Sequence, residues 1–217
     1  MKKLKIGLVG TSQHSFPGDK ETAYGKCVEA MKKLSEKIGF DLSVYNETVI
    51  TAADAGVALK YFESEKIDFL MIQHTSYSSG YLADAFGRWA ASHDVKIGLW
   101  AIPEGVDSGV VPFNSMCSIN MHQAILYHYF KDMKIKAKWF FGYPDDKRFI
   151  ARLDITVKAL RSIKNMNSSK IALIGGIAPG FNDLYNDERQ FLKLFKGLEY
   201  NRLVEYDEIK SIALSIP

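Results

Sequence analysis

The stretch Leu4-Lys5-Ile6-Gly7-Leu8-Val9 is a short apolar run that leads directly into Gly10-Thr11-Ser12-Gln13-His14-Ser15-Phe16. A run of this length, ended by a glycine and a polar loop, predicts a buried strand. Similar runs predict further strands at 42–45, 69–72, 97–100 and 139–141. Apolar residues at helical spacing separate them, and this alternation is typical of βαβ units. We therefore predict an α/β fold, a flavodoxin-like doubly wound parallel sheet in the order 2-1-3-4-5.

Helix-ending residues support the first of these units. Asp19 stands before Lys20-Glu21-Thr22 as a predicted N-cap, and Gly39 follows the last apolar residue of the stripe. We expect a helix between them. Later stripes predict helices through 55–62, 82–89 and 149–163, each covering the sheet.

We expect two domains. Residues 1–165 form the N-terminal flavodoxin-like domain, and a polar linker, Asn165-Met166-Asn167-Ser168-Ser169, precedes a new strand at 170–174. A helix around 187–196 and a strand at 203–206 follow, whereas 209–217 lacks a closing helix. A segment of fewer than about 50 residues seldom folds alone. We therefore interpret 170–217 as the start of a second, Rossmann-like α/β domain that is truncated, the alternative being a sixth strand of the first sheet.

Composition excludes several classes of protein. The 217 residues are 47% hydrophobic and 24% charged, with a net charge of +3 and no basic block of the kind that binds nucleic acid. The first apolar run is too short for a signal peptide, and no stretch is long enough to span a membrane. Cys27 and Cys117 have neither metal-ligand nor disulfide-framework spacing. We expect a cytoplasmic protein without nucleic-acid or membrane partners.

Polar loops follow the predicted strands, where the carboxyl edge of a parallel sheet binds ligands. Gln73-His74 repeats the amide and imidazole chemistry of Gln13-His14, and directional side-chain groups of this kind suit a polyol better than a nucleotide phosphate, which needs glycines. The alternative is that these groups only satisfy strand ends. For His122, which shares an apolar stripe with Ile119, Leu126 and Tyr129, a structural role and a ligand role both stay open. The convergent loops lie at 10–16, 46–47, 73–76, 103–105 and 142–145.

Several short motifs resemble the L-fucose and L-arabinose isomerase family. Gly10-Thr11-Ser12-Gln13-His14 and Gln73-His74-Thr75 are similar to loops after the family's first and third strands. Asn114, within Pro112-Phe113-Asn114-Ser115, stands where arabinose isomerases carry Asp, and Asn120-Met121-His122 follows. The run from Gly175-Gly176 to Tyr185 is similar to the opening of the family's second domain.

This resemblance implies the substrate-pocket part of a metal-dependent aldose–ketose isomerase. Mn²⁺ is then expected in the full-length enzyme and not in this chain, because the catalytic and metal-binding residues would lie beyond Pro217. The chain alone would be inactive, its partner an aldose or ketose, and the full protein a homotrimer or homohexamer. The alternatives are a stand-alone flavodoxin-like sugar-binding module without catalysis and an oligomerisation scaffold. The expected substrate-binding residues are Gln13, His14, Phe16, His74, Glu104, Asn114, Asn120 and His122.

Overall fold

The computed structural model describes residues 3–106, 108–133, 135–174, 180–184, 187–204 and 206–216. The chain divides into two compact units, 3–158 and 159–217, which are described separately.

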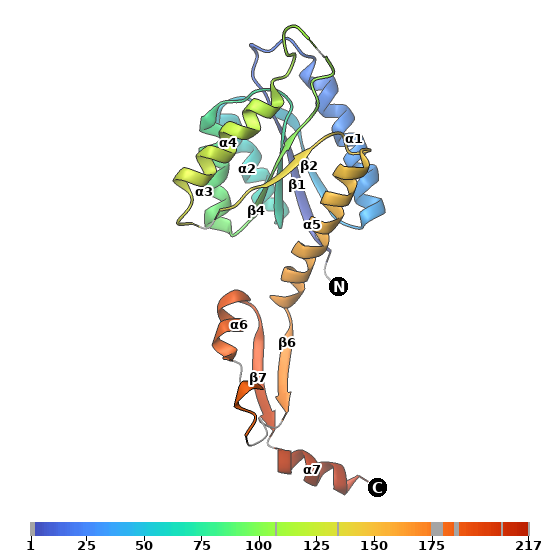
Figure 1. The fold of residues 1–217 in the computed structure, drawn as a ribbon, viewed down its shortest axis with the longest axis vertical. Coiled ribbons are helices and arrows are strands. Elements are labelled where there is room, and N and C mark those ends of the chain that lie inside the picture. Colours follow the sequence, from blue (N-terminus) through green and yellow to red (C-terminus); the bar gives the residue numbers. More distant parts are fainter. Residues whose placement is uncertain are drawn as a thin grey trace. The chain divides into compact units, whose positions relative to one another are not determined.

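A five-stranded parallel sheet forms the centre of the N-terminal unit, with the strand order β2-β1-β3-β4-β5 (Figure 1). This order confirms the predicted doubly wound α/β fold. Strands and helices alternate along the chain: β1 (Lys5–Thr11), α1 (Lys20–Ile38), β2 (Asp41–Val49), α2 (Ala52–Glu65), β3 (Phe69–His74), α3 (Gly80–His93), β4 (Lys96–Ala101), α4 (Ser115–Tyr129), β5 (Lys138–Phe141) and α5 (Lys147–Met166).

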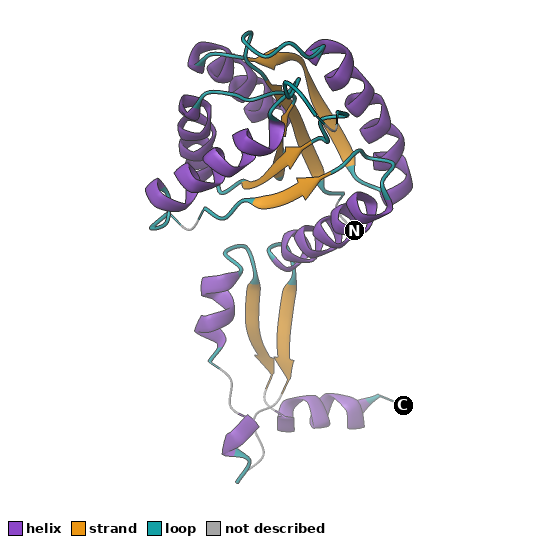
Figure 2. Cartoon of the chain, turned by 45° about the horizontal axis from the view of Figure 1, so that its top comes forward, coloured by secondary structure: helices purple, strands orange, loops and turns teal. Residues whose placement is uncertain are grey.

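Helices cover both faces of this sheet, α2, α3 and α4 on one face and α1 and α5 on the other (Figures 1 and 2). On the first face Phe62, Phe86 and Leu126 join one buried cluster with the strands. On the second, the Phe149 ring of α5 lies 5.0 Å from that of Trp100 and 5.8 Å from that of Phe140. The central strands β1, β3 and β4 are therefore shielded from water on both faces, which accounts for their continuous apolar runs in the sequence.

The ends of α1 follow the predicted signals. The Asp19 carboxylate accepts a hydrogen bond from the backbone N–H of Thr22 and caps the helix. Gly39 ends it in the left-handed conformation, with φ 83°, and its N–H donates to the Ser35 carbonyl. The predicted N-cap and the predicted end of the helix are both confirmed. Both could be predicted because each depends only on local backbone geometry.

One expected loop belongs to a strand. Asn46 and Glu47 are exposed residues within β2, not the start of a loop at the carboxyl edge. The strand continues because its pairing with β1 shifts between Val9 and Gly10, so that Thr48 and Val49 pair with the last two residues of β1. An irregularity of this kind keeps two polar residues in an edge strand.

The C-terminal unit contains β6 (Lys170–Ile174), a 3₁₀ turn at Asn182–Leu184, α6 (Glu188–Leu194), β7 (Glu199–Val204) and α7 (Tyr206–Ser215). β6 and β7 pair in parallel in a sheet of their own, so β6 is not a sixth strand of the first sheet. The expected strand at 203–206 overlaps β7 only at 203–204, and residues 206–215 form α7, a helix that the sequence did not predict. Asp207 and Glu208 in the first turn of α7 favour that helix through its dipole.

The division between the two units falls within α5, after Lys158, and the expected domain boundary at 165 stays a prediction. That 170–217 begins a larger, truncated α/β domain stays a prediction. Residues 175–179 and 185 of the expected second-domain motif lie outside the described residues. No helix in the described part of the chain combines the length and apolar character needed to cross a membrane.

Candidate functional site

The loops that follow β1, β3 and β4 meet at the carboxyl edge of the sheet, and hydrogen bonds from their backbone N–H groups join them. After β1, the N–H of Gln13 donates to the Ser76 hydroxyl at 3.0 Å, and the N–H of Gly18 donates to the Pro112 carbonyl at 2.9 Å. After β3, the N–H of Tyr77 donates to the Phe113 carbonyl at 2.6 Å. A Cβ atom built on Gly18 would lie 2.4 Å from the Phe113 ring, so a side chain at position 18 would collide with that ring. The loops are therefore fixed against one another before any ligand arrives.

The surface of these loops carries an aromatic pair, and Gln13 lies on the same loop as one of its two rings. The rings of Phe16 and Tyr77 lie 5.6 Å apart, and both residues are half-buried. Gln13 is also half-buried, while His14 and Ser15 are exposed. The Tyr77 hydroxyl contacts the Met121 sulfur at 3.2 Å. We call Gln13, Phe16 and Tyr77 the edge surface.

Beneath the loops lies a closed polar cluster around two histidines. The His74 Nδ1 atom lies 2.8 Å from the Ser118 hydroxyl, and the His122 Nε2 atom lies 3.1 Å from the Ser79 carbonyl and 3.3 Å from the Ser78 hydroxyl. The two imidazole rings meet edge to face, with centroids 4.5 Å apart. Both histidines are fully buried. The cluster therefore packs α4 against the end of β3.

Both imidazoles are held neutral. Burial lowers the pKa of His122 to about 4, and burial together with the neighbouring His122 lowers the pKa of His74 well below its usual value. A carbonyl faces His122 Nε2, so that nitrogen carries the proton and Nδ1 is an acceptor. Within the described residues, three buried nitrogens of this region have no hydrogen-bond partner: Gln73 Nε2, His74 Nε2 and His122 Nδ1.

Glu104 caps helix α4. Its carboxylate accepts hydrogen bonds from the backbone N–H groups of Phe113 (2.9 Å), Asn114 (3.1 Å) and Ser115 (3.0 Å). Asn114 adopts the left-handed conformation, with φ 53°, and its side chain makes no capping bond. A carboxylate at the positive end of a helix replaces the missing side-chain cap. Both oxygens of Glu104 are thus used within the protein.

The structure divides seven of the expected substrate-binding residues into three groups and leaves Asn120 apart. Gln13, His14 and Phe16 lie together on the loop after β1, whereas His74 and His122 meet in the buried cluster. Glu104 contacts the backbone of Asn114. Asn120 is exposed, and two helical positions separate it from buried His122, so the two side chains lie on different faces of α4. Tyr129, expected on the apolar face, is 76% exposed.

Sequence reasoning missed Tyr77, Ser78 and Ser118. The spacing of Ser115, Ser118 and His122 is a helical stripe, and this polar stripe was the available signal for a cluster facing the sheet.

Comparison with known proteins assigns the chain to no family. No family model matches the chain, and no curated protein matches it. It is similar to a GDP-6-OMe-4-keto-L-xylo-heptose reductase from C. jejuni, at 10% identity and a TM-score of 0.43, over 98% of this chain and 93% of that one. A GDP-mannoheptose C4 reductase from Campylobacter jejuni with NADP bound is 11% identical, with a TM-score of 0.42, over 98% and 94%.

The dTDP-4-dehydrorhamnose reductase from Yersinia enterocolitica is 10% identical, with a TM-score of 0.40 over 80% of this chain. The chain spans 64% of that reductase. At these scores the substrates and cofactors of the three enzymes are properties of those enzymes alone.

These findings correct the expected isomerase identity. No isomerase family matches the chain, and the solved structures described above are reductases of nucleotide-linked sugars. The expectation of Mn²⁺ depended on that isomerase identity and is wrong with it. In addition, the described residues contain no group of three or more His, Cys, Asp or Glu side chains arranged to hold a metal ion.

Proposed function

We propose that the N-terminal unit binds a small polyhydroxylated molecule on the edge surface of Gln13, Phe16 and Tyr77. The observation that carries the proposal is the half-buried aromatic pair of Phe16 and Tyr77, on loops that are already joined by hydrogen bonds and that also carry Gln13. Aromatic rings pack against the apolar face of a sugar ring, and the amide supplies one acceptor and two donors for hydroxyl groups. Fixed loops lose little entropy on binding.

The position in the fold supports the same proposal. In an open α/β sheet the loops after the carboxyl ends of the strands are where ligands bind, and β1 and β3 are neighbours there. The buried histidines lie under this surface, so they support the loops without touching a ligand. The homo-oligomer and the cytoplasmic location expected from the sequence stay predictions.

The test is an NMR titration of the ¹⁵N-labelled protein with neutral pentoses and hexoses. We expect shifts in residues 12–18 and 75–79, and binding weakened about tenfold in Phe16→Ala and in Gln13→Ala. Tyr81→Ala is the matched control, because this tyrosine is 79% exposed and lies outside the edge surface. No shifts at sugar concentrations up to about 100 mM, or equal weakening by the control, would refute the proposal.

A further inference from the structure

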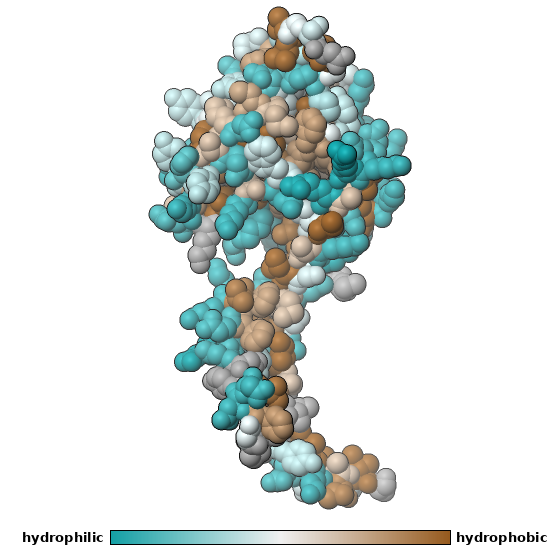
Figure 3. Space-filling model, in the orientation of Figure 1, coloured by the Kyte–Doolittle hydropathy of each residue, from teal (hydrophilic) through white to brown (hydrophobic). Residues whose placement is uncertain are grey.

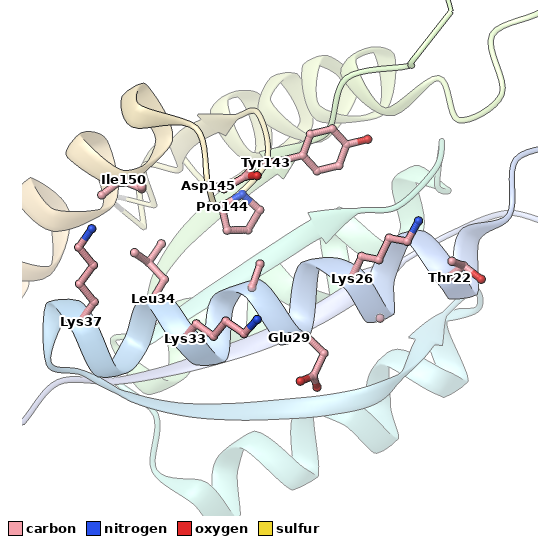
Figure 4. Close-up of a pocket in the computed structure, with 12 residues that line it drawn as sticks. Thr22, Lys26, Glu29, Lys33, Leu34, Lys37, Tyr143, Pro144, Asp145 and Ile150 are labelled. Carbon is pink, nitrogen blue, oxygen red and sulfur yellow. The ribbon is translucent and has the colours of Figure 1, made fainter.

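A long groove lies between α1 and the start of α5, and none of the three edge-surface residues lines it. It has a volume of about 910 Å³, and residues 143–145 after β5 form part of its far wall (Figure 4). Ala30, Leu34, Pro144 and Ile150 give it an apolar middle. Helices α1 and α5 cover the same sheet face but make few contacts with each other. Helices that pack against each other are in contact along their length, so the groove is a gap in the helix layer.

Lysines line the α1 side of the groove. Lys26, Lys33 and Lys37 are exposed on one stripe of the helix, and none of them makes an ion pair among the described residues. Figure 4 shows Lys37 extending toward Ile150 of α5 and Lys26 extending toward Tyr143, with Leu34 between the two lysines along α1. The two lysines are about 16 Å apart along the axis, from 11 residues at about 1.5 Å each.

Two acidic side chains also line the groove. Glu29 is bound to Lys32 at 2.8 Å, outside the lining, and Asp145 stands on the opposite wall. The α1 side therefore presents positive charge at both ends of an apolar trough. The surface of the N-terminal unit is largely hydrophilic, with apolar groups exposed among the polar ones (Figure 3).

Gly25 is an independent observation at the same place. It lies in the interior of α1 and lines the groove, yet a Cβ built on it would meet no atom within 4 Å. A glycine inside a helix is destabilising relative to alanine, and here neither backbone geometry nor internal packing requires it. A missing side chain at this point allows the backbone of another molecule to approach α1 closely.

We propose that this groove binds an acidic amphipathic helix of a partner protein. The apolar face of such a helix would fill the gap between α1 and α5, and carboxylates near its two ends would pair with Lys26 and Lys37. The length between these lysines corresponds to about three helical turns, which suits a helix laid along the groove. The proposal is independent of the ligand proposed for the edge surface.

The probe is a synthetic helical peptide of about 16 residues, with apolar residues at helical spacing and glutamates elsewhere, titrated into the ¹⁵N-labelled protein. We expect saturable shifts in α1 and in residues 143–150. Lys26→Glu combined with Lys37→Glu should weaken binding at least about tenfold, and Lys60→Glu combined with Lys136→Glu, which changes net charge equally outside the groove, should not.

Gly25→Leu should also weaken binding about tenfold by filling the trough, while raising the melting temperature because leucine favours a helix. Gly56→Leu is its matched control, since Gly56 is an exposed glycine inside α2 with equally open space. A peptide of the same composition without helical periodicity should not bind.

Three results would overturn the proposal. The first is no shift up to about 1 mM peptide, or equal binding by both charge-reversal pairs. The second is binding of tripolyphosphate, with the same lysine dependence, in place of the peptide, which would assign the groove to a small anion. The third is self-association that the Lys26→Glu and Lys37→Glu pair abolishes, which would assign it to a second copy of the chain.

Discussion

Acid should destabilise the N-terminal unit through the buried histidines, and replacing His122 should remove a measurable part of this effect. The pKa of His122 is about 4 in the folded protein, against about 6.5 when the side chain is free in water. Between these values the unfolded chain takes up a proton that the folded protein does not. Folding stability therefore falls as the pH drops through about 6.5 and levels off below about 4.

The size of the effect follows from the two pKa values. A difference of about 2.5 units, at about 1.4 kcal/mol per unit, gives a limiting contribution of about 3 kcal/mol. About 2 kcal/mol of this should be lost between pH 7 and pH 4.5. The pKa of His74 is lowered in the same direction, so its contribution has the same sign.

The assay is urea unfolding followed by tryptophan fluorescence at a series of pH values. Trp89, Trp100 and Trp139 all belong to the N-terminal unit, so the signal reports its unfolding. His122→Gln should be less stable at neutral pH, but between pH 7 and pH 4.5 it should lose about 2 kcal/mol less than the wild-type protein.

His128→Gln is the control, because His128 is an exposed histidine on the same helix. It should keep the wild-type pH dependence. The reasoning is refuted if the wild-type protein and His122→Gln lose stability in parallel with falling pH, because His122 would then not be buried in its neutral form.

Three further substitutions test stability, two of them at the carboxyl edge of the sheet and the third in helix α2. Glu104→Ala should lower the free energy of unfolding by about 1–2 kcal/mol, because three N–H groups at the start of α4 lose their acceptor. An unchanged urea midpoint would contradict this role of Glu104. Gly10→Ala should lower the free energy of unfolding by about 1–3 kcal/mol in the same assay, because the new Cβ would lie 2.9 Å from the Tyr24 ring. The Tyr24 hydroxyl donates to the Leu8 and Tyr45 carbonyls and holds the ring in place. An unchanged stability would mean that the ring moves. Gly56→Ala should instead stabilise α2 by about 0.5–1 kcal/mol, and a lower melting temperature would show a constraint at this position.

The sheet could be predicted because the residues that identify each strand are neighbours in the sequence. Strands buried on both faces read as continuous apolar runs, and the parallel crossovers leave few strand orders. The end of β2 was not predictable, since Asn46 and Glu47 are poor strand formers that the shifted pairing with Gly10 keeps in place. That pairing joins residues far apart in the sequence.

The candidate site could be predicted only in part, because its contacts also join residues that are far apart in the sequence. A helical stripe shows that His122 faces inward, but its contact with His74 depends on how α4 docks on the end of β3. The cap formed by Glu104 depends on the left-handed conformation of Asn114, which no local signal indicates. The groove likewise required the position of residues 143–150, although the lysine spacing along α1 is visible in the sequence.

The two Gln-His pairs show why a motif did not define a role. Gln13-His14 follows the last residue of β1, Thr11, so its histidine is exposed on a loop. Gln73-His74 lies within β3, where His74 pairs with Thr11 on one side and Ala101 on the other and is buried. Where each strand ends therefore decides whether the same two residues face solvent or the interior. A ligand bound at the proposed edge surface would contact the first pair, whereas the second pair would affect binding by holding α4 and the loop after β3 in place.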